Sequence, residues 1–294
     1  FTVDETLIGL PVAPQATVLF YNQTWAEELG YSSQPENIVE FRQQVCAATF
    51  ANLDDEIMDN DGTGGFPRNF DPQVLASWYH AFDGQLPSMG RLQFNTEAGS
   101  QAFGFLKSVD KEGCIWIHRQ PEPFWYFANR YALIYAGTLD QIPIQMGWMN
   151  ASQNKDQWVV TGFPGPDREV MLIDGPGLMV TADAPEKQLA AWLFARHLLE
   201  PEIQAQLVES LITLPVRKSA ESLLAEFGEI YPQWAQAVSM MEIAEPLPAS
   251  NEWGISQWVL QDAVIRLVEV EEDQTDLILE ELDAMIDELE GNVP

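Results

Sequence analysis

Apolar residues follow two spacings along this chain, and each spacing predicts a different kind of element. Short apolar runs bounded by Gly, Pro or polar residues predict strands near residues 7–11, 17–21, 132–135, 170–173 and 178–180. Longer segments with apolar residues three and four positions apart predict helices, which begin near residues 24, 36, 72, 95, 185, 201, 222, 231, 252 and 276. Because strands and helices are interspersed, the pattern predicts an α/β fold.

The stretch 163–220 is the most informative part of this pattern. Two of the predicted strands flank the sequence Asp174-Gly175-Pro176-Gly177, where glycine allows a ligand to approach the backbone closely. The helices after residue 178 alternate with too few strands for one simple wound sheet. We therefore expect two α/β lobes, with the binding site in the cleft between them.

Composition and charge exclude some classes of function. The chain has 294 residues and is 46% hydrophobic, which is typical of a globular protein. No apolar run approaches the roughly 20 residues of a membrane helix, so we expect no direct membrane span. The 45 acidic residues outnumber the 14 basic ones, and this surface repels nucleic-acid phosphates and anionic lipids. Solvation explains the net charge of -31 most simply, and attraction of a cationic ligand is an alternative.

The two cysteines, Cys46 and Cys114, are far apart and fit no metal-ligand spacing. Two arrangements are open at this point. The cysteines form a disulfide, as in many exported proteins, or they remain two buried thiols.

The loop at residues 59–65 gathers side-chain oxygens before a glycine turn, a pattern that can bind calcium. If Gly62 takes the sixth position of such a loop, Ile57 and Arg68 stand where the first and twelfth ligands belong. The sequence therefore favours a solvated loop, with Asp59 and Asp61 as a weak calcium candidate. It predicts no other metal site and no cofactor.

Signatures of a catalytic centre are missing from the sequence. The chain contains no Gly-x-Ser-x-Gly, no His-Glu-x-x-His and no glycine-rich phosphate loop, so we expect no enzyme. A glycoside-cleaving carboxylate pair is an alternative, because 45 acidic residues form pairs by chance. The chain also has 10 Trp, 7 Tyr and 15 Phe, and aromatic faces can stack on sugar rings, although most such rings belong to the core.

Several short motifs occur in order along nearly the whole chain. They are GLPV (9–12), LFYN (19–22), DG (61–62), WYHAFDG (78–84), FNTE (94–97), ALIYAG (132–137) and LPVRKS (214–219). This ordered set resembles the extracellular solute-binding proteins of bacterial ABC importers, in the sugar-binding group related to maltose-binding protein. Each motif alone is weak, but their order is fairly specific.

The resemblance implies a two-lobed fold of the periplasmic-binding-protein type II. Residues 9–160 and 220–290 would form the second lobe, and residues 163–216 would return to the first lobe. Members of this group are usually longer, and the initial strands of their first lobe have no counterpart before Phe1. We therefore expect the first lobe to be incomplete.

The resemblance also implies a set of ligand-facing residues. They belong to the end of one strand, the glycine turn, one helix and the start of a late helix. The candidates are Trp78, Tyr135, Gly137, Thr138, Asp174, Gly175, Gly177, Trp253 and Trp258. Leu139 stands where some relatives have an aromatic residue, which weakens the expectation of one stacking contact.

By this resemblance the protein is the carbohydrate-binding subunit of an ABC importer. It would capture a sugar or oligosaccharide in the interlobe cleft and deliver it to the membrane permease subunits. We expect it outside the cytoplasm, in the periplasm or as a cell-surface lipoprotein. A binder of a non-sugar solute, such as a polyamine or peptide, is the alternative that the net charge keeps open.

Overall fold

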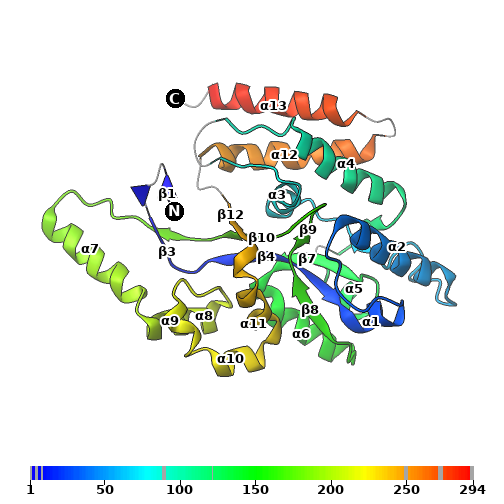
Figure 1. The fold of residues 1–294 in the computed structure, drawn as a ribbon, viewed down its shortest axis with the longest axis horizontal. Coiled ribbons are helices and arrows are strands. Elements are labelled where there is room, and N and C mark those ends of the chain that lie inside the picture. Colours follow the sequence, from blue (N-terminus) through cyan, green and yellow to red (C-terminus); the bar gives the residue numbers. More distant parts are fainter. Residues whose placement is uncertain are drawn as a thin grey trace.

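A computed structural model describes residues 2–3, 6–7, 9–87, 91–120, 122–247, 251–270 and 274–291. In these residues a six-stranded mixed sheet lies between two layers of helices (Figure 1). Its strands are β4 (Gln15–Asn22), β7 (Ile134–Thr138), β8 (Trp158–Thr161), β9 (Phe163–Pro164), β10 (Glu169–Asp174) and β12 (Ala244–Pro246). The predicted α/β class is confirmed.

Strand β4 lies in the middle of the sheet. Strand β7 runs antiparallel along one side of it, and the other side is shared by β10 at the start of β4 and β8 at its end. Strand β12 is parallel to β10, and β9 is antiparallel to β10. The start of β4 therefore meets the ends of β7 and β10 at one edge of the sheet, where Gln15 is opposite Asp174 and Thr17 is opposite Thr138.

Both faces of the sheet are buried, which explains the continuous apolar run in β4. Leu19 and Tyr21 belong to one core, while Val18 and Phe20 belong to the other, because successive side chains of a strand point to opposite faces. The first core contains residues of α2 (Ile38–Asp54), α3 (Pro72–Ala81), α4 (Glu97–Lys111), α12 (Asn251–Glu269) and α13 (Thr275–Gly291). The second contains residues of α5 (Phe124–Ala128), α6 (Ile142–Ala151), α8 (Pro201–Leu211), α10 (Ala225–Ile230) and α11 (Pro232–Ser239).

Local capping sets the starts of three helices on the first face. The Asn37 side chain accepts hydrogen bonds from two backbone N–H groups of the first turn of α2. Asp71 and Thr96 each accept one such bond at the starts of α3 and α4. These bonds satisfy N–H groups that have no partner within the helix, so the sequence alone is sufficient to predict the three starts.

Short elements complete the described fold. They are the strand pairs β1 (Thr2–Val3) with β2 (Thr6–Leu7), β3 (Leu10–Pro11) with β11 (Gly177–Leu178) and β5 (Phe66–Pro67) with β6 (Ile115–Trp116), and the helices α1 (Gln23–Glu28), η1 (Leu139–Gln141), α9 (Lys218–Glu221) and η2 (Met241–Ile243). None of the helices in the described residues is long and apolar enough to cross a membrane.

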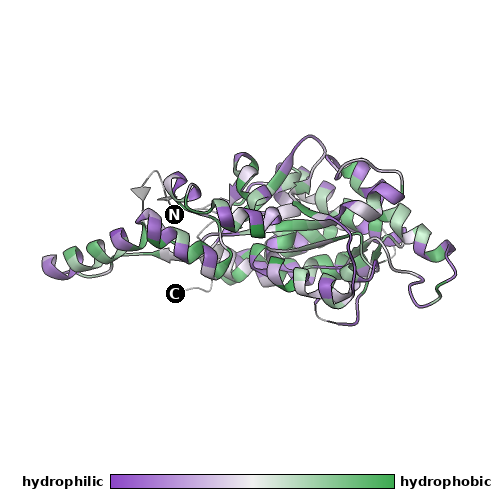
Figure 2. Cartoon of the chain, turned by 90° about the horizontal axis from the view of Figure 1, so that it is seen from below, coloured by the Kyte–Doolittle hydropathy of each residue, from purple (hydrophilic) through white to green (hydrophobic). Residues whose placement is uncertain are grey.

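The stretch 163–216 departs from its expected path. We assigned all of it to a returning segment of the first lobe, but β9 and β10 pair within the main sheet, so the chain leaves this sheet only after Asp174. The strand expected at residues 178–180 ends at Leu178. Helix α7 (Pro185–Leu198) then projects away from the sheet (Figures 1 and 2).

Candidate ligand-binding cleft

A cavity of about 610 Å³ opens at the sheet edge where β4 begins and where β7 and β10 end. Its walls come from these three strand ends, η1, the loop between β5 and α3, the start of α3, the segment between β6 and α5, and one side chain of α12. The lining residues with polar side chains include Gln15, Asn69, Asp71, Gln73, Tyr135, Thr138, Asp174 and Gln261. The strand register brings together residues that are far apart in the sequence.

Gly137 gives this cavity its shape at the end of β7. A Cβ atom at this position would lie 2.3 Å from Oε1 of Gln141 and 3.1 to 3.2 Å from the rings of Phe20 and Tyr135. A larger residue would therefore displace the side chains that line the cavity. Glycine is required here by close packing.

Tyr135 is fully buried and lines the cavity. Its ring stacks on Phe20, with ring centroids 4.4 Å apart, so its position is fixed by the core. Among the described residues, its hydroxyl has no hydrogen-bond partner, and the same holds for Oε1 of Gln15 and Oε1 of Gln141. Buried polar atoms are usually paired, so three unpaired ones on residues that line a single cavity set this wall apart. Burial and the nearby Glu122 raise the pKa of Tyr135, which keeps the hydroxyl protonated.

Two carboxyl groups, Asp71 and Asp174, lie in the same cavity. Asp71 caps α3 by accepting a hydrogen bond from the backbone N–H of Gln73, at 3.0 Å. The Gln73 side chain in turn donates to Asp174. Burial raises the pKa of both carboxyl groups, and the charge of Asp71 raises that of Asp174 further. A ligand that donates hydrogen bonds to these oxygens would offset their desolvation.

Arg68 also lines the cavity, but its charge is already paired. Its Nε and Nη2 atoms donate to Oδ1 of Asp110 at 3.0 and 2.6 Å, and its guanidinium lies over the Phe70 ring at 5.6 Å. The cavity therefore offers hydroxyl, amide and carboxyl groups rather than a free guanidinium. This set of groups suits a ligand rich in hydroxyl groups.

A second cavity of about 750 Å³ adjoins the first and shares Gln73 and Asp174 with it. Its wall is mainly apolar and includes Pro215, Leu247 and Trp253. A continuous cleft with one polar and one apolar half thus runs along the sheet edge. Among the residues that the sequence predicted, it collects Tyr135, Gly137, Thr138, Asp174, Gly175 and Trp253.

Three predicted residues line neither cavity. Trp78 is fully buried and packs edge-on against Phe41 and Phe163, so its predicted ligand contact is replaced by a role in the core. Trp258 is 59% exposed on α12, and Gly177 lies in the short strand β11. The sequence missed Gln15, Asn69, Asp71, Gln73 and Gln261, for which only the helix-capping position of Asp71 was a local signal.

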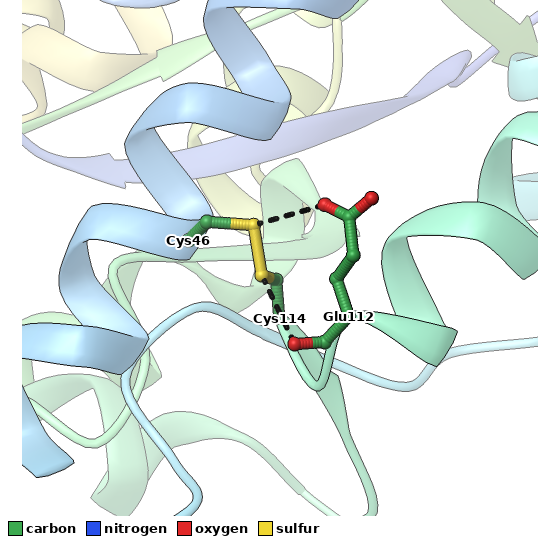
Figure 3. A group of neighbouring side chains, drawn as sticks. All are labelled: Cys46, Glu112 and Cys114. Atoms are coloured by element: carbon green, nitrogen blue, oxygen red, sulfur yellow. Dashed lines mark hydrogen bonds between the residues drawn. A yellow bond between two sulfur atoms is a disulfide. The ribbon is translucent and has the colours of Figure 1, made fainter.

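The cysteines form a disulfide that joins α2 to the segment before β6, with their Cα atoms 4.8 Å apart (Figure 3). The Glu112 carboxylate lies beside Cys46 and also accepts a hydrogen bond from Arg42. These three residues, Cys46, Glu112 and Cys114, are the one group with metal-ligand proximity in the described residues, and the disulfide leaves no thiolate to bind a metal. Asp59 and Asp61 belong to no group of three or more such side chains in the described residues.

The fold and the cleft define a solute-binding protein of the two-lobed periplasmic type. The chain belongs to the bacterial extracellular solute-binding protein family, whose profile matches residues 1–241. Its location is therefore extracytoplasmic. No curated protein sequence matches the chain.

Solved structures with this fold cover nearly the whole chain. The sugar-binding protein MalE from Xanthomonas citri has a TM-score of 0.81 and 21% identity, covering 98% of this chain and 71% of its own. The cyclic alpha-maltosyl-1,6-maltose binding protein from Arthrobacter globiformis has a TM-score of 0.75 and 18% identity, covering 97% and 73%. UgpB from Mycobacterium tuberculosis, in complex with glycerophosphocholine, has a TM-score of 0.75 and 16% identity, covering 99% and 73%. These matches bear out the two-lobed fold with an incomplete first lobe.

Proposed function

We propose that this solute-binding protein is the carbohydrate-binding subunit of an ABC importer, and that the cavity at the start of β4 holds the sugar. The observation that carries this proposal is that three residues lining one cavity, Gln15, Tyr135 and Gln141, each have a buried polar atom with no partner among the described residues. Sugars present many hydroxyl groups that donate and accept, so they satisfy such atoms without adding a charge.

In this proposal Tyr135, Thr138, Asp71 and Asp174 contact the sugar, and Gly137 keeps the cavity open. The apolar half of the cleft, which contains Trp253, receives the C–H faces of further sugar units. Closure of a complete first lobe over this cavity would then enclose the sugar for delivery to the permease. In this proposal residues 9–174 and 220–290 form the second lobe, so its first segment ends at residue 174, where the chain leaves the main sheet, instead of at residue 160.

The test is a titration of intrinsic tryptophan fluorescence and heat with a panel of neutral oligosaccharides that includes maltotriose. We expect saturable binding to at least one of them, and Asp174→Asn should weaken it about tenfold, the size of one hydrogen bond to a charged group. Asp167→Asn, an exposed change outside the cleft, is the matched control. Absence of binding to every sugar, together with binding of an unrelated solute, would exclude the carbohydrate assignment.

The same substitution separates binding from stability. Because the pKa of Asp174 is raised in the folded protein, its folded form holds a proton more tightly than the unfolded chain. Ionisation of Asp174 therefore lowers the free energy of unfolding as the pH rises through its folded pKa. We expect Asp174→Asn to unfold at a higher temperature than wild type at pH 7, and this difference should vanish below about pH 4. A variant that binds sugar poorly because it is misfolded would show the opposite change.

A cationic solute is the second candidate, and the acidic groups of the cavity favour it. The lining contains Asp71, Glu122, Asp140 and Asp174, while the charge of Arg68 is paired with Asp110. Calorimetry at low and high salt distinguishes the candidates, since the affinity for a cation falls steeply with ionic strength while that for a neutral sugar does not.

A further inference from the structure

Two features of the sequence lie outside the cleft, the polar loop before Gly62 and the aromatic segment 116–131. The structure brings them together around a separate cavity of about 510 Å³. Its lining includes Asp59, Asp61, Trp116, Arg119, Trp125 and Tyr131. We refer to it as the outer cavity.

Aromatic rings form one wall of the outer cavity in two layers. Trp125 and Tyr131 are half-buried, with ring centroids 5.0 Å apart and planes tilted by 46°. Behind them, the buried rings of Trp116 and Tyr126 pack edge-on at 5.0 Å. The outer pair therefore keeps partly exposed aromatic surface that rests on a packed support.

Backbone contacts fix the polar loop against this wall. The N–H of Gly64 donates to the carbonyl oxygen of Tyr131 at 2.8 Å, and the Asn52 side chain donates to the carbonyl oxygen of Arg130 at 3.1 Å. Gly64 has a φ of +113°, and a Cβ atom there would lie 2.4 Å from the Ala48 carbonyl oxygen. Only glycine allows this approach, so the cavity is formed before any ligand binds.

Polar groups of both kinds surround the aromatic faces. Trp116 is 8% exposed, and its indole N–H has no acceptor among the described residues. Asp59 and Asp61 are exposed acceptors, and Arg119 is an exposed donor. Burial raises the pKa of Tyr131, and the charges of Asp59 and Asp55 raise it further.

We propose that the outer cavity is a second saccharide-binding site, separate from the cleft and facing outward. The aromatic faces stack on the C–H faces of a sugar ring. The two carboxylates accept hydrogen bonds from its hydroxyl groups, and the N–H groups of Trp116 and Arg119 donate hydrogen bonds to its oxygens. Arg119 makes a neutral saccharide a better fit than an organic cation, because a cation would meet a guanidinium in the same cavity. The outer site does not require that the cleft bind a sugar.

An array of immobilised neutral oligosaccharides tests this site on the whole chain. The starting variant is Asp174→Asn, which weakens the cleft, and it is compared with the same variant carrying Trp125→Ala or Asp59→Asn. We expect glycan signals that persist in Asp174→Asn and fall about tenfold with either added change. The matched control adds Trp192→Ala, a half-exposed tryptophan on α7, and should leave these signals unchanged.

Three results would overturn the outer site. In the first, no glycan signal persists in Asp174→Asn. In the second, the signals that persist are unchanged by both Trp125→Ala and Asp59→Asn. In the third, choline chloride removes the signals at low ionic strength while an equal concentration of sodium chloride does not. Asp59 is exposed in a loop, so Asp59→Asn reports on the site even where Trp125→Ala disturbs folding. Loss of sugar binding to the cleft alone would count against the proposed function and leave the outer site standing.

Discussion

Helices α3 and α7 have similar apolar spacing but opposite surroundings. In α3, Trp78 is fully buried, and the helix packs against β10, α4 and α12. In α7, the side chains of Trp192, Leu193 and Phe194 are 49%, 51% and 58% exposed. Figure 2 shows α7 projecting beyond the body of the protein. An apolar stripe therefore becomes core only where another element covers it, and a large uncovered stripe is a surface for contact.

Replacing the two tryptophans separately tests this contrast most strongly. We expect Trp78→Ala to lower the free energy of unfolding by about 3–5 kcal/mol, because it leaves a large cavity among aromatic rings. Trp192→Ala should change it by less than about 0.5 kcal/mol. Urea denaturation measures both. Equal losses would show that α7 is covered in solution.

The disulfide provides a second contrast between the body of the protein and α7, because it crosslinks α2 to the segment before β6 and α7 contains no cysteine. Changing both Cys46 and Cys114 to Ser should cost about 2–4 kcal/mol, because the bond closes a loop between residues 68 positions apart. Urea unfolding of the double variant and of reduced wild type should give the same loss. Proteolysis within α7 should be unaffected by reduction, and a reduction-dependent change there would contradict independent behaviour of the two regions.

Each helix carries a histidine in its last turn, and these two residues sharpen the contrast with pH. His80 of α3 is buried beside Glu245 and Arg168, and burial is the main cause that lowers its pKa to about 4. His197 of α7 is exposed and contacts Glu200.

His80 binds a proton at a higher pH in the unfolded chain than in the folded protein. The free energy of unfolding therefore falls as the pH decreases from about 6.5 to about 4. The loss for this one group is up to about 3 kcal/mol. Thermal unfolding across this range should show a smaller loss in His80→Gln than in wild type. An unchanged pH profile in His80→Gln would assign the acid response to other groups.

The smallest expected effect concerns the surface of α7. Replacing Trp192 and Phe194 together with Ser should leave the unfolding temperature nearly unchanged, because both side chains already contact water. Binding of a hydrophobic dye to the folded protein should decrease, and fluorescence measures it. Unchanged dye binding would indicate that other apolar surface dominates.

Local patterns predicted most of the elements of the second lobe. The caps at Asn37, Asp71 and Thr96 set helix starts through bonds to the adjacent turn, so neighbouring residues suffice to predict them. The apolar run at residues 17–21 predicted a strand, and the structure contains it as β4. The expected path of residues 163–216 was partly wrong, because β10 pairs with β4 and no local pattern identifies this partner.

The cleft was predicted where a strand end, the glycine turn or the start of a late helix matched the family resemblance. Gly137 and Asp174 stood out by such signals, and both line the cleft. Gln15, Asn69 and Gln73 are ordinary polar residues in the sequence. The strand register sets Gln15 opposite Asp174, and the packing of α3 and the loop before it brings Gln73 and Asn69 to the same cavity. Trp78 was misplaced because its pattern is the same for a core ring and for a ligand platform.

The sequence by itself determined the α/β class, most of the helix starts, the large negative charge and the resemblance to solute-binding proteins, because these follow from composition and from residues close together in the chain. The tertiary structure decided which apolar helix is covered, which polar side chains meet in the cleft, and that Cys46 bonds to Cys114. These outcomes depend on pairings across the length of the chain. The register that sets Gln15 opposite Asp174 is one such pairing, and it is fixed by burial of the whole sheet rather than by either residue.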